Sequence, residues 1–162
     1  MVAVVADTHM PKGERVLPDR CHELLRAAEL IVHAGDWSQI AVLEMFESIG
    51  PPLVGVRGNV EDAEIRRRLP ERAEFEFAGR RVGVIHDAGP RRGRLERLRR
   101  EFPDADAVIF GHSHMPLLER DSDGGFQIFN PGSPTERRRA PTRTMGTISA
   151  ADGSLQFRHF DL

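Results

Sequence analysis

The chain has 162 residues, of which 40% are hydrophobic and 30% charged, and its formal net charge is -2. This length favours one domain spanning residues 1–162 and leaves little room for a separate substrate-binding domain. No apolar run approaches the roughly 18 residues of a membrane helix, so no membrane partner is expected. The weak net charge gives no general attraction to a phosphate backbone, so no stable nucleic-acid partner is expected and a nuclease is disfavoured.

Cysteine usage and the start of the chain bear on the compartment. Cys21 is the only cysteine, which excludes an intramolecular disulfide. The apolar start at Val2–Ala6 has no basic flank and is too short for the core of a signal peptide. Both features predict a cytoplasmic protein.

Apolar runs of strand length alternate with helical periodicity through the first two thirds of the chain. The predicted buried strands are Val2–Ala6, Leu30–Ala34, Leu53–Val56, Val82–Ile85 and Ala107–Phe110. The predicted helices are Asp19–Glu29, Gln39–Ile49 and Arg94–Glu101. This order predicts βαβ units, that is, a largely parallel sheet with helices on its faces.

The later part of the chain has the turn signals of β-hairpins, such as Gly124-Gly125 and Asp152-Gly153. The predicted strands beside these turns are Met115–Arg120, Phe126–Phe129, Thr144–Ser149 and Leu155–Phe160. We expect these strands to form a second, antiparallel sheet that packs on the first. The predicted fold class is therefore α/β, a two-sheet mixed β sandwich flanked by helices.

Side chains that bind metals follow each of the five predicted buried strands. They are Asp7, His9, Asp36, Asn59, His86, His112 and His114. Because ligands of open α/β sheets bind at the carboxyl ends of the strands, we expect these seven side chains to converge.

The donor types indicate which metal chemistry suits the set. Two carboxylates, one amide and four imidazoles without a thiolate suit manganese, iron, zinc, nickel or cobalt better than calcium or an iron-sulfur cluster. Seven ligands are more than a single tetrahedral ion can bind. Two ions that share a carboxylate, with positions left open for water and substrate, would use them all, which is the design of a dinuclear hydrolase.

The same residues carry a resemblance to a known family. In chain order they form the blocks D-x-H (Asp7–His9), G-D (Gly35-Asp36), G-N (Gly58-Asn59), H (His86) and G-H-x-H (Gly111–His114). The chain thereby resembles the calcineurin-like metallophosphoesterase superfamily. This resemblance implies the αββα fold of that superfamily. Residues 130–133, Asn-Pro-Gly-Ser, also resemble a segment of the small bacterial and archaeal phosphodiesterases of that superfamily.

The resemblance implies a metal-dependent phosphodiesterase with a small diester substrate. It implies one ion on Asp7, His9, Asp36 and His114 and a second on Asp36, Asn59, His86 and His112, with Asp36 as the bridge. Manganese is the first expectation for both ions, with nickel, iron, zinc and cobalt as alternatives. The implied nucleophile is a hydroxide between the ions, and the implied catalytic residues are Asp36, Asn59 and His112.

Two positions depart from the family pattern. Many members have a histidine after the G-N pair that protonates the leaving group, and this chain has Val60 there. Unactivated monoesters should therefore be poor substrates. Asp87 stands where members often have H-G-H, and it either orients a ligand histidine or water, or caps the following turn.

Several residues outside the blocks have a structural interpretation beside a functional one. We expect His33 to be a hydrogen-bonded core residue, Trp37 to pack in the core, and the arginines of residues 91–100 to form a solvated helix face. The arginine-rich loop at 137–143 either binds a distal phosphate of the substrate or lies at a homo-oligomer interface. The alternative function is a non-catalytic protein-binding scaffold of the same fold, although no ligand position here is apolar.

Overall fold

The first strand, β1 (Val2–Val5), is buried at every residue because both of its faces are covered. In the computed structural model, which describes residues 1–162, Val2 and Val4 point into the core between two sheets. Ala3 and Val5 point into a second core beneath helices. A strand covered on both sides reads as a continuous apolar run, which is why the run was recognisable in the sequence.

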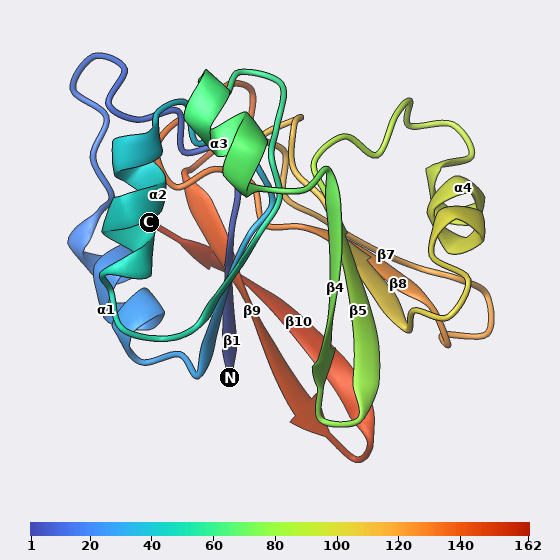
Figure 1. Ribbon diagram of the computed structural model, residues 1–162. Coiled ribbons are helices and arrows are strands. Elements are labelled where there is room, and N and C mark those ends of the chain that lie inside the picture. Colours follow the sequence, from blue (N-terminus) through green and yellow to red (C-terminus); the bar gives the residue numbers. More distant parts are fainter.

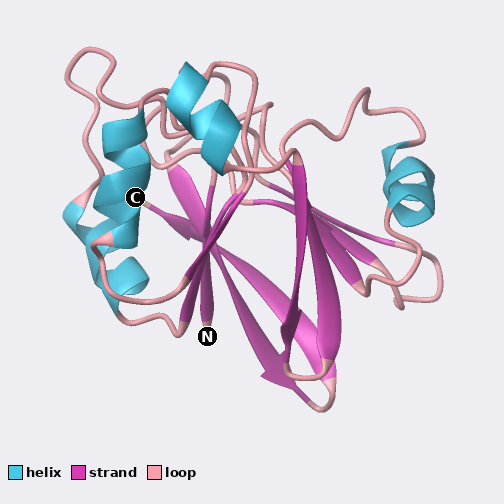
Figure 2. Ribbon diagram, in the orientation of Figure 1, coloured by secondary structure: helices cyan, strands magenta, loops and turns pink.

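Two mixed sheets of five strands pack face to face, and helices cover both outer faces (Figures 1 and 2). The first sheet has the order β10-β9-β1-β2-β3, and its other strands are β2 (Leu30–His33), β3 (Leu53–Gly55), β9 (Thr144–Ala151) and β10 (Ser154–Asp161). The second sheet has the order β4-β5-β6-β8-β7, made of β4 (Arg72–Phe77), β5 (Arg80–Ile85), β6 (Ala107–Ile109), β7 (Leu117–Arg120) and β8 (Gln127–Asn130).

The helices complete a four-layer arrangement. Helices α1 (Asp19–Arg26) and α2 (Ile40–Glu47) cover the first sheet, and α4 (Arg94–Glu101) covers the second. The short helix α3 (Ala63–Arg68) follows β3. None of the four helices combines the length and the apolar character that a bilayer crossing requires.

The predicted fold class is confirmed, but the expected assignment of strands to sheets was wrong. Strands β9 and β10 do not join the later sheet; β9 pairs antiparallel with β1 and continues the first sheet, while β5, β6 and β8 run parallel in the second. The first five residues of β9 are buried because both faces of the sheet are covered there: Met145 belongs to the core beneath the helices and Ile148 to the core between the sheets. The local sequence identifies such a strand but does not determine which strand it pairs with.

Helix α3 was not expected, because only six residues form it and three of them are arginines. Its N-cap is Asp62, whose side chain accepts hydrogen bonds from the backbone N–H groups of Ile65 and Ile40. Asp62 therefore ties the start of α3 to the start of α2.

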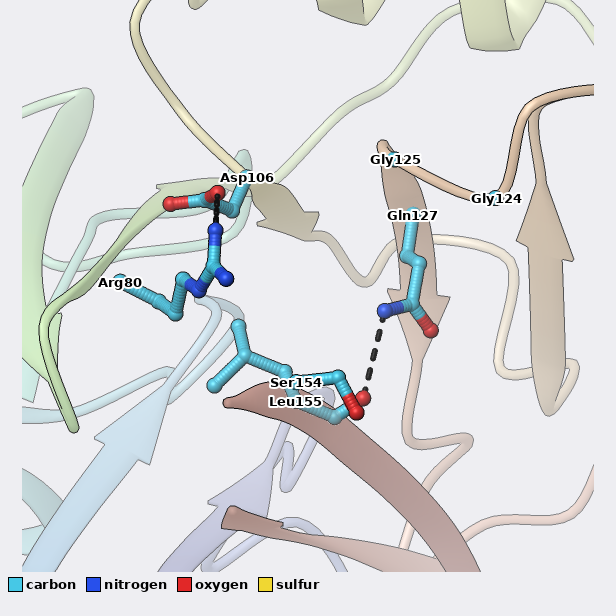
Figure 3. A pocket seen from close by; sticks show the side chains of 7 residues that line it. All are labelled: Arg80, Asp106, Gly124, Gly125, Gln127, Ser154 and Leu155. Carbon is cyan, nitrogen blue, oxygen red and sulfur yellow. Dashed lines mark hydrogen bonds and ion pairs between the residues drawn. The ribbon is translucent and has the colours of Figure 1, made fainter. Parts of the chain in front are cut away.

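A small cleft of about 110 Å³ lies between the two sheets at the amino ends of β5, β6, β8 and β10 (Figure 3). Polar contacts close it. The Gln127 Nε2 group donates to the Leu155 carbonyl at 3.2 Å, and the Arg80 guanidinium pairs with Asp106 at 3.0 Å. The Gln127–Leu155 contact joins the two sheets, whereas the Arg80–Asp106 pair lies within the second sheet, at the end of the sandwich opposite the loops that carry the predicted metal ligands.

Candidate metal centre

The loops after β1, β2, β3, β5 and β6 meet at the carboxyl ends of these strands, on the side of the sandwich away from the N-terminus (Figure 1). The structure brings all seven predicted metal-binding side chains together there. The ligand atoms of Asp7, His9 and His114 lie within 4.8 Å of one another, and so do those of Asp36, His86 and His112. Two neighbouring groups of ligand atoms thus stand where the sequence predicted one convergent site.

The carboxylate of Asp36 lies between the two groups. Its Oδ2 is 3.3 Å from His9 Nε2, and its Oδ1 is 3.3 Å from His86 Nε2. One oxygen therefore faces each group, which is the arrangement a bridging carboxylate needs.

Asn59 faces the second group and is open to solvent. Its Oδ1 lies 3.1 Å from His86 Nε2 and 3.2 Å from His112 Nδ1, while its Nδ2 makes no hydrogen bond within the protein. His112 is exposed as well, whereas His86 is buried. The two groups are accessible from the side of Asn59 and His112.

The backbone at the site is held in an unusual conformation. Left-handed φ angles occur at five of the seven residues, namely Asp7 (57°), His9 (46°), Asp36 (61°), His112 (68°) and His114 (59°). Each such residue costs about 1 kcal/mol or more relative to right-handed backbone, and strain of this kind clusters at functional sites. The surrounding hydrogen bonds must compensate for it.

The glycines of the G-D and G-N pairs are required by close approach. A Cβ at Gly58 would lie 2.1 Å from Asp36 Oδ1, and one at Gly35 would lie 2.7 Å from His86 Nδ1. Any larger side chain at either position would displace Asp36 or His86. The backbone N–H of Asn59 instead donates to Asp36 Oδ1 at 2.8 Å.

Asp7 has an unmet electrostatic requirement that a cation would satisfy. It is buried, and its Oδ2 has no hydrogen-bond partner. Burial raises the pKa of this carboxyl to about 7, and nearby Asp36 adds to the shift. A buried, unpartnered carboxylate oxygen beside two imidazoles fits a divalent metal ion.

Three of the other groups are already in the protonation states that metal binding requires. Burial lowers the pKa of His114 to about 4 and also lowers the pKa of His9, so both rings are neutral near pH 7. Burial opposes ionisation of Asp36, but hydrogen bonding and attraction to His86 outweigh it and place its pKa at about 2. His9, His114 and Asp36 thus offer neutral nitrogens and an ionised carboxylate. Burial favours the neutral form of His86, but hydrogen bonding and attraction to Asp36 outweigh it and raise the pKa of this ring, so metal binding there competes with protonation.

Metal affinity is expected to fall as the pH drops below about 7. A cation must displace the proton of Asp7, whose pKa is about 7, so the apparent Kd should rise by up to about tenfold per pH unit through this group alone. Titration calorimetry with Mn²⁺ at about pH 8 and about pH 6 measures the change. In Asp7→Asn the slope of log Kd against pH should decrease by about one, and an unchanged slope would contradict the prediction.

A buried carboxylate that the sequence analysis missed holds the loop around Asp36. Glu61 is 5% exposed, and its oxygens accept hydrogen bonds from the backbone N–H groups of Asp36 (2.8 Å), Ser38 (2.9 Å) and Gly58 (2.7 Å), and also from Trp37. It joins the loop after β2 to the loop after β3. The signal available in the sequence was its place two residues after Asn59.

The Asn-Pro-Gly-Ser segment, together with Thr135 two residues after it, fixes the first and last loops of the site. Ser133 Oγ donates to the Asp7 carbonyl at 2.8 Å, and Thr135 Oγ1 donates to the Thr8 carbonyl at 2.7 Å. Asn130 Nδ2 donates to the Gly111 carbonyl at 2.7 Å. The segment thus positions the loops that carry Asp7, His9, His112 and His114.

The remaining predictions for individual residues have clear outcomes. Fully buried His33 lies 3.1 Å from Thr8 Oγ1 and stacks on Trp37, so the core interpretation of both aromatic rings is confirmed. Asp87 Oδ1 accepts a hydrogen bond from Gly89 N at 2.7 Å, which is the turn-capping alternative. Val60 is 42% exposed beside Asn59.

The arginines near helix α4 are not only a solvated face. The Arg97 guanidinium donates to the carbonyls of Ala88 (2.6 Å) and Pro90 (2.7 Å), and Arg94 lies over the Phe110 ring. These contacts hold the loop that follows His86. Arg92 and Arg100 remain exposed, as expected.

Comparison with known proteins agrees with this geometry. Residues 1–153 match the calcineurin-like phosphoesterase superfamily domain. The chain belongs to this superfamily. A probable metallophosphoesterase of Methanothermobacter thermautotrophicus is 34% identical over 140 residues, which are 85% of this chain and 79% of that protein. The family resemblance carried by the five blocks is confirmed.

Solved structures share the fold over nearly the whole chain. Vps29 from Entamoeba histolytica, complexed with Zn²⁺, superposes with a TM-score of 0.76 at 18% identity and covers 99% of this chain and 98% of its own. A novel archaeal phosphodiesterase superposes with a TM-score of 0.73 at 20% identity and covers 99% of both chains. At these identities the likeness shows the fold alone, which is the predicted metallophosphoesterase sandwich.

Proposed function

We propose that the protein hydrolyses small phosphodiesters with two divalent metal ions, and that one domain, residues 1–162, carries this activity. The observation that carries the proposal is the Asp36 carboxylate, whose two oxygens each lie 3.3 Å from an imidazole of a different ligand group. Superfamily membership and the likeness to an archaeal phosphodiesterase support it. When bound, such ions lower the pKa of water toward neutrality and offset charge on phosphoryl oxygens.

The first ion would be held by Asp7, His9, His114 and one oxygen of Asp36, and the second by Asn59, His86, His112 and the other oxygen of Asp36. We propose manganese for both positions, since the oxygen and nitrogen donor set suits it, with nickel, iron, zinc and cobalt as alternatives.

The chain's own residues bind and orient the phosphate. Asn59 would ligate through Oδ1, which leaves Nδ2 free to donate a hydrogen bond to a phosphoryl oxygen. Exposed His112 borders the same open side. Both residues act where the substrate reaches the site, and Asp36 holds the two groups together.

The preference for an activated leaving group rests on Val60. No titratable side chain stands at this position to protonate a leaving alkoxide, so the site favours esters whose leaving group is already a weak base. An aryl diester meets this condition, and an alkyl monoester does not.

Restoring activity to metal-stripped protein tests the function. Bis(p-nitrophenyl) phosphate is offered to protein treated with a chelator and then resupplied separately with Mn²⁺, Ni²⁺, Zn²⁺ or Mg²⁺. We expect no turnover without metal and the highest turnover with Mn²⁺, and we expect an alkyl monoester to react at least about 10²-fold more slowly because it needs an acid catalyst. Absence of turnover with every metal would refute the proposal.

A protein-binding scaffold is the second candidate, because Vps29 structures share the fold. The surface offers little to such a partner: the exposed large apolar side chains are only Val16, Val60, Met115 and Leu118. A protein-docking surface of ordinary type would expose a larger apolar area. The metal-restoration assay separates the two candidates.

A further inference from the structure

A cleft of about 510 Å³ lies beside the metal centre, on the side of His9. One wall is the loop that follows His9, residues 12–16, which projects beyond α2 in Figure 1, and the other is formed by Thr135 and Arg143. None of the seven predicted metal-binding residues lines it.

The lining of this cleft is basic. Three basic side chains, Lys12, Arg15 and Arg143, face one acidic side chain, Glu14. Arg15 is neutralised by an ion pair with Glu136 at 2.9 Å. Lys12 and Arg143 form no ion pair and no side-chain hydrogen bond, although most arginines around the metal centre have a partner. The lining therefore holds two unpaired cations, Lys12 and Arg143, against one unpaired carboxylate, Glu14, and keeps an excess of positive charge.

Hydrogen bonds connect the cleft to the metal centre through one layer of backbone. Arg15 Nη1 donates to the His9 carbonyl at 3.5 Å, and Thr135 Oγ1 donates to the Thr8 carbonyl at 2.7 Å. On the same segment as Arg143, Arg138 Nη1 donates to the His112 carbonyl at 3.5 Å. Basic side chains thus extend from the cleft to the open face of the site.

We propose that this cleft is a phosphate-binding subsite, distinct from the metal centre, in which Lys12 and Arg143 hold a phosphate group. An ammonium and a guanidinium without protein partners are the donors that bind a phosphate by charge-assisted hydrogen bonds. The lining has one apolar residue, Val16, and no aromatic ring, so it suits an anion rather than a base or an acyl chain.

The assignment deepens the proposed function. If the phosphate belongs to the substrate, the enzyme acts on a diester that carries a second phosphate group away from the scissile one. If it is free, the subsite takes inorganic pyrophosphate or a similar polyanion. Both sources share the same chemistry, and the two arms of the experiment separate them.

The first arm does not depend on metal or catalysis. Lys12 is the only lysine in the chain, so its acetylation by an N-hydroxysuccinimide ester reports on one site, with the N-terminal amine as internal reference. The full chain is labelled in EDTA with and without sodium pyrophosphate, and the Lys12 peptide is followed by mass spectrometry. We expect pyrophosphate to slow Lys12 acetylation at least about fivefold relative to sodium chloride at equal ionic strength, because binding buries the amine.

Matched variants localise the effect. Arg143→Gln should weaken pyrophosphate binding about tenfold, as expected for loss of one charge-assisted contact. Arg26→Gln removes an exposed arginine at the end of α1, near the amino ends of the strands, and should leave binding unchanged. Equal protection by chloride, or equal weakening in both variants, would overturn the proposal.

The second arm identifies the source of the phosphate. The p-nitrophenyl ester of thymidine 5′-phosphate is compared with the same ester carrying a 3′-phosphate, using metal-loaded enzyme. A ratio of kcat/KM that favours the 3′-phosphorylated ester and falls about tenfold in Arg143→Gln assigns the subsite to the substrate. A ratio that Arg143→Gln does not change, together with Lys12 protection in the first arm, assigns it to a free polyanion. Loss of turnover alone leaves the first arm intact, so failure of the proposed function is recognised separately.

Discussion

Replacing Asp36 by Asn is expected to lower kcat/KM for bis(p-nitrophenyl) phosphate by about 10³-fold while the protein stays folded. The reason is geometric: each oxygen of this carboxylate lies 3.3 Å from an imidazole of a different ligand group. An amide keeps the shape but removes the charge, and its NH₂ group would donate toward one group instead of accepting. The oxygen that remains can still accept from Asn59 N, so the loop should hold.

A matched control is available at Asp87. This carboxylate is exposed next to His86, and it accepts a hydrogen bond from Gly89 N. Asp87→Asn should therefore retain activity within about twofold, since an Asn side chain forms the same turn. Steady-state kinetics and titration of bound metal on both variants test the contrast. If Asp36→Asn keeps its activity within about tenfold, Asp36 does not join two metal sites.

The convergence of the seven predicted ligands was predictable because each follows an apolar run that had to be a buried strand. Buried parallel strands send their carboxyl ends to one edge, so order along the chain becomes proximity in space. Asp7 and His112 lie 105 residues apart, yet the His112 N–H donates to Asp7 Oδ1 at 3.1 Å. The position of metal-binding residues at strand ends is therefore the feature that this sequence predicts best.

The pairing between strands that are distant in the sequence was harder to predict. The β9–β10 hairpin was identified from Asp152-Gly153, where both residues have positive φ, as a type I′ turn requires. Its docking on β1 depends on which sheet edge is open, and no residue of β9 encodes that locally. The same limit applies to Gly146, which pairs with Val4 and lies against the Phe129 ring of the other sheet.

Glu61 shows a third limit, since a lone acidic residue in a polar segment reads as solvated until its burial is known. Glu61→Gln is expected to destabilise the protein by about 2 kcal/mol and to lower metal affinity and kcat/KM by about 10–100-fold. One carboxylate oxygen accepts from Asp36 N and Gly58 N, and the other from Ser38 N. Glutamine can place its oxygen in only one of these positions, and its NH₂ group would then oppose a backbone N–H.

The test of Glu61 separates positioning of the loop from general loss of stability. Glu64→Gln is the control, because Glu64 lies half-buried on α3 and pairs only with Arg67. It should change the free energy of unfolding by less than about 0.5 kcal/mol. Urea denaturation, metal titration and kinetics are measured at a temperature where both variants are fully folded. If folded Glu61→Gln binds Mn²⁺ as tightly as the control, the carboxylate stabilises the fold without positioning Asp36; weaker binding by folded protein shows that the four backbone hydrogen bonds hold the bridge in place.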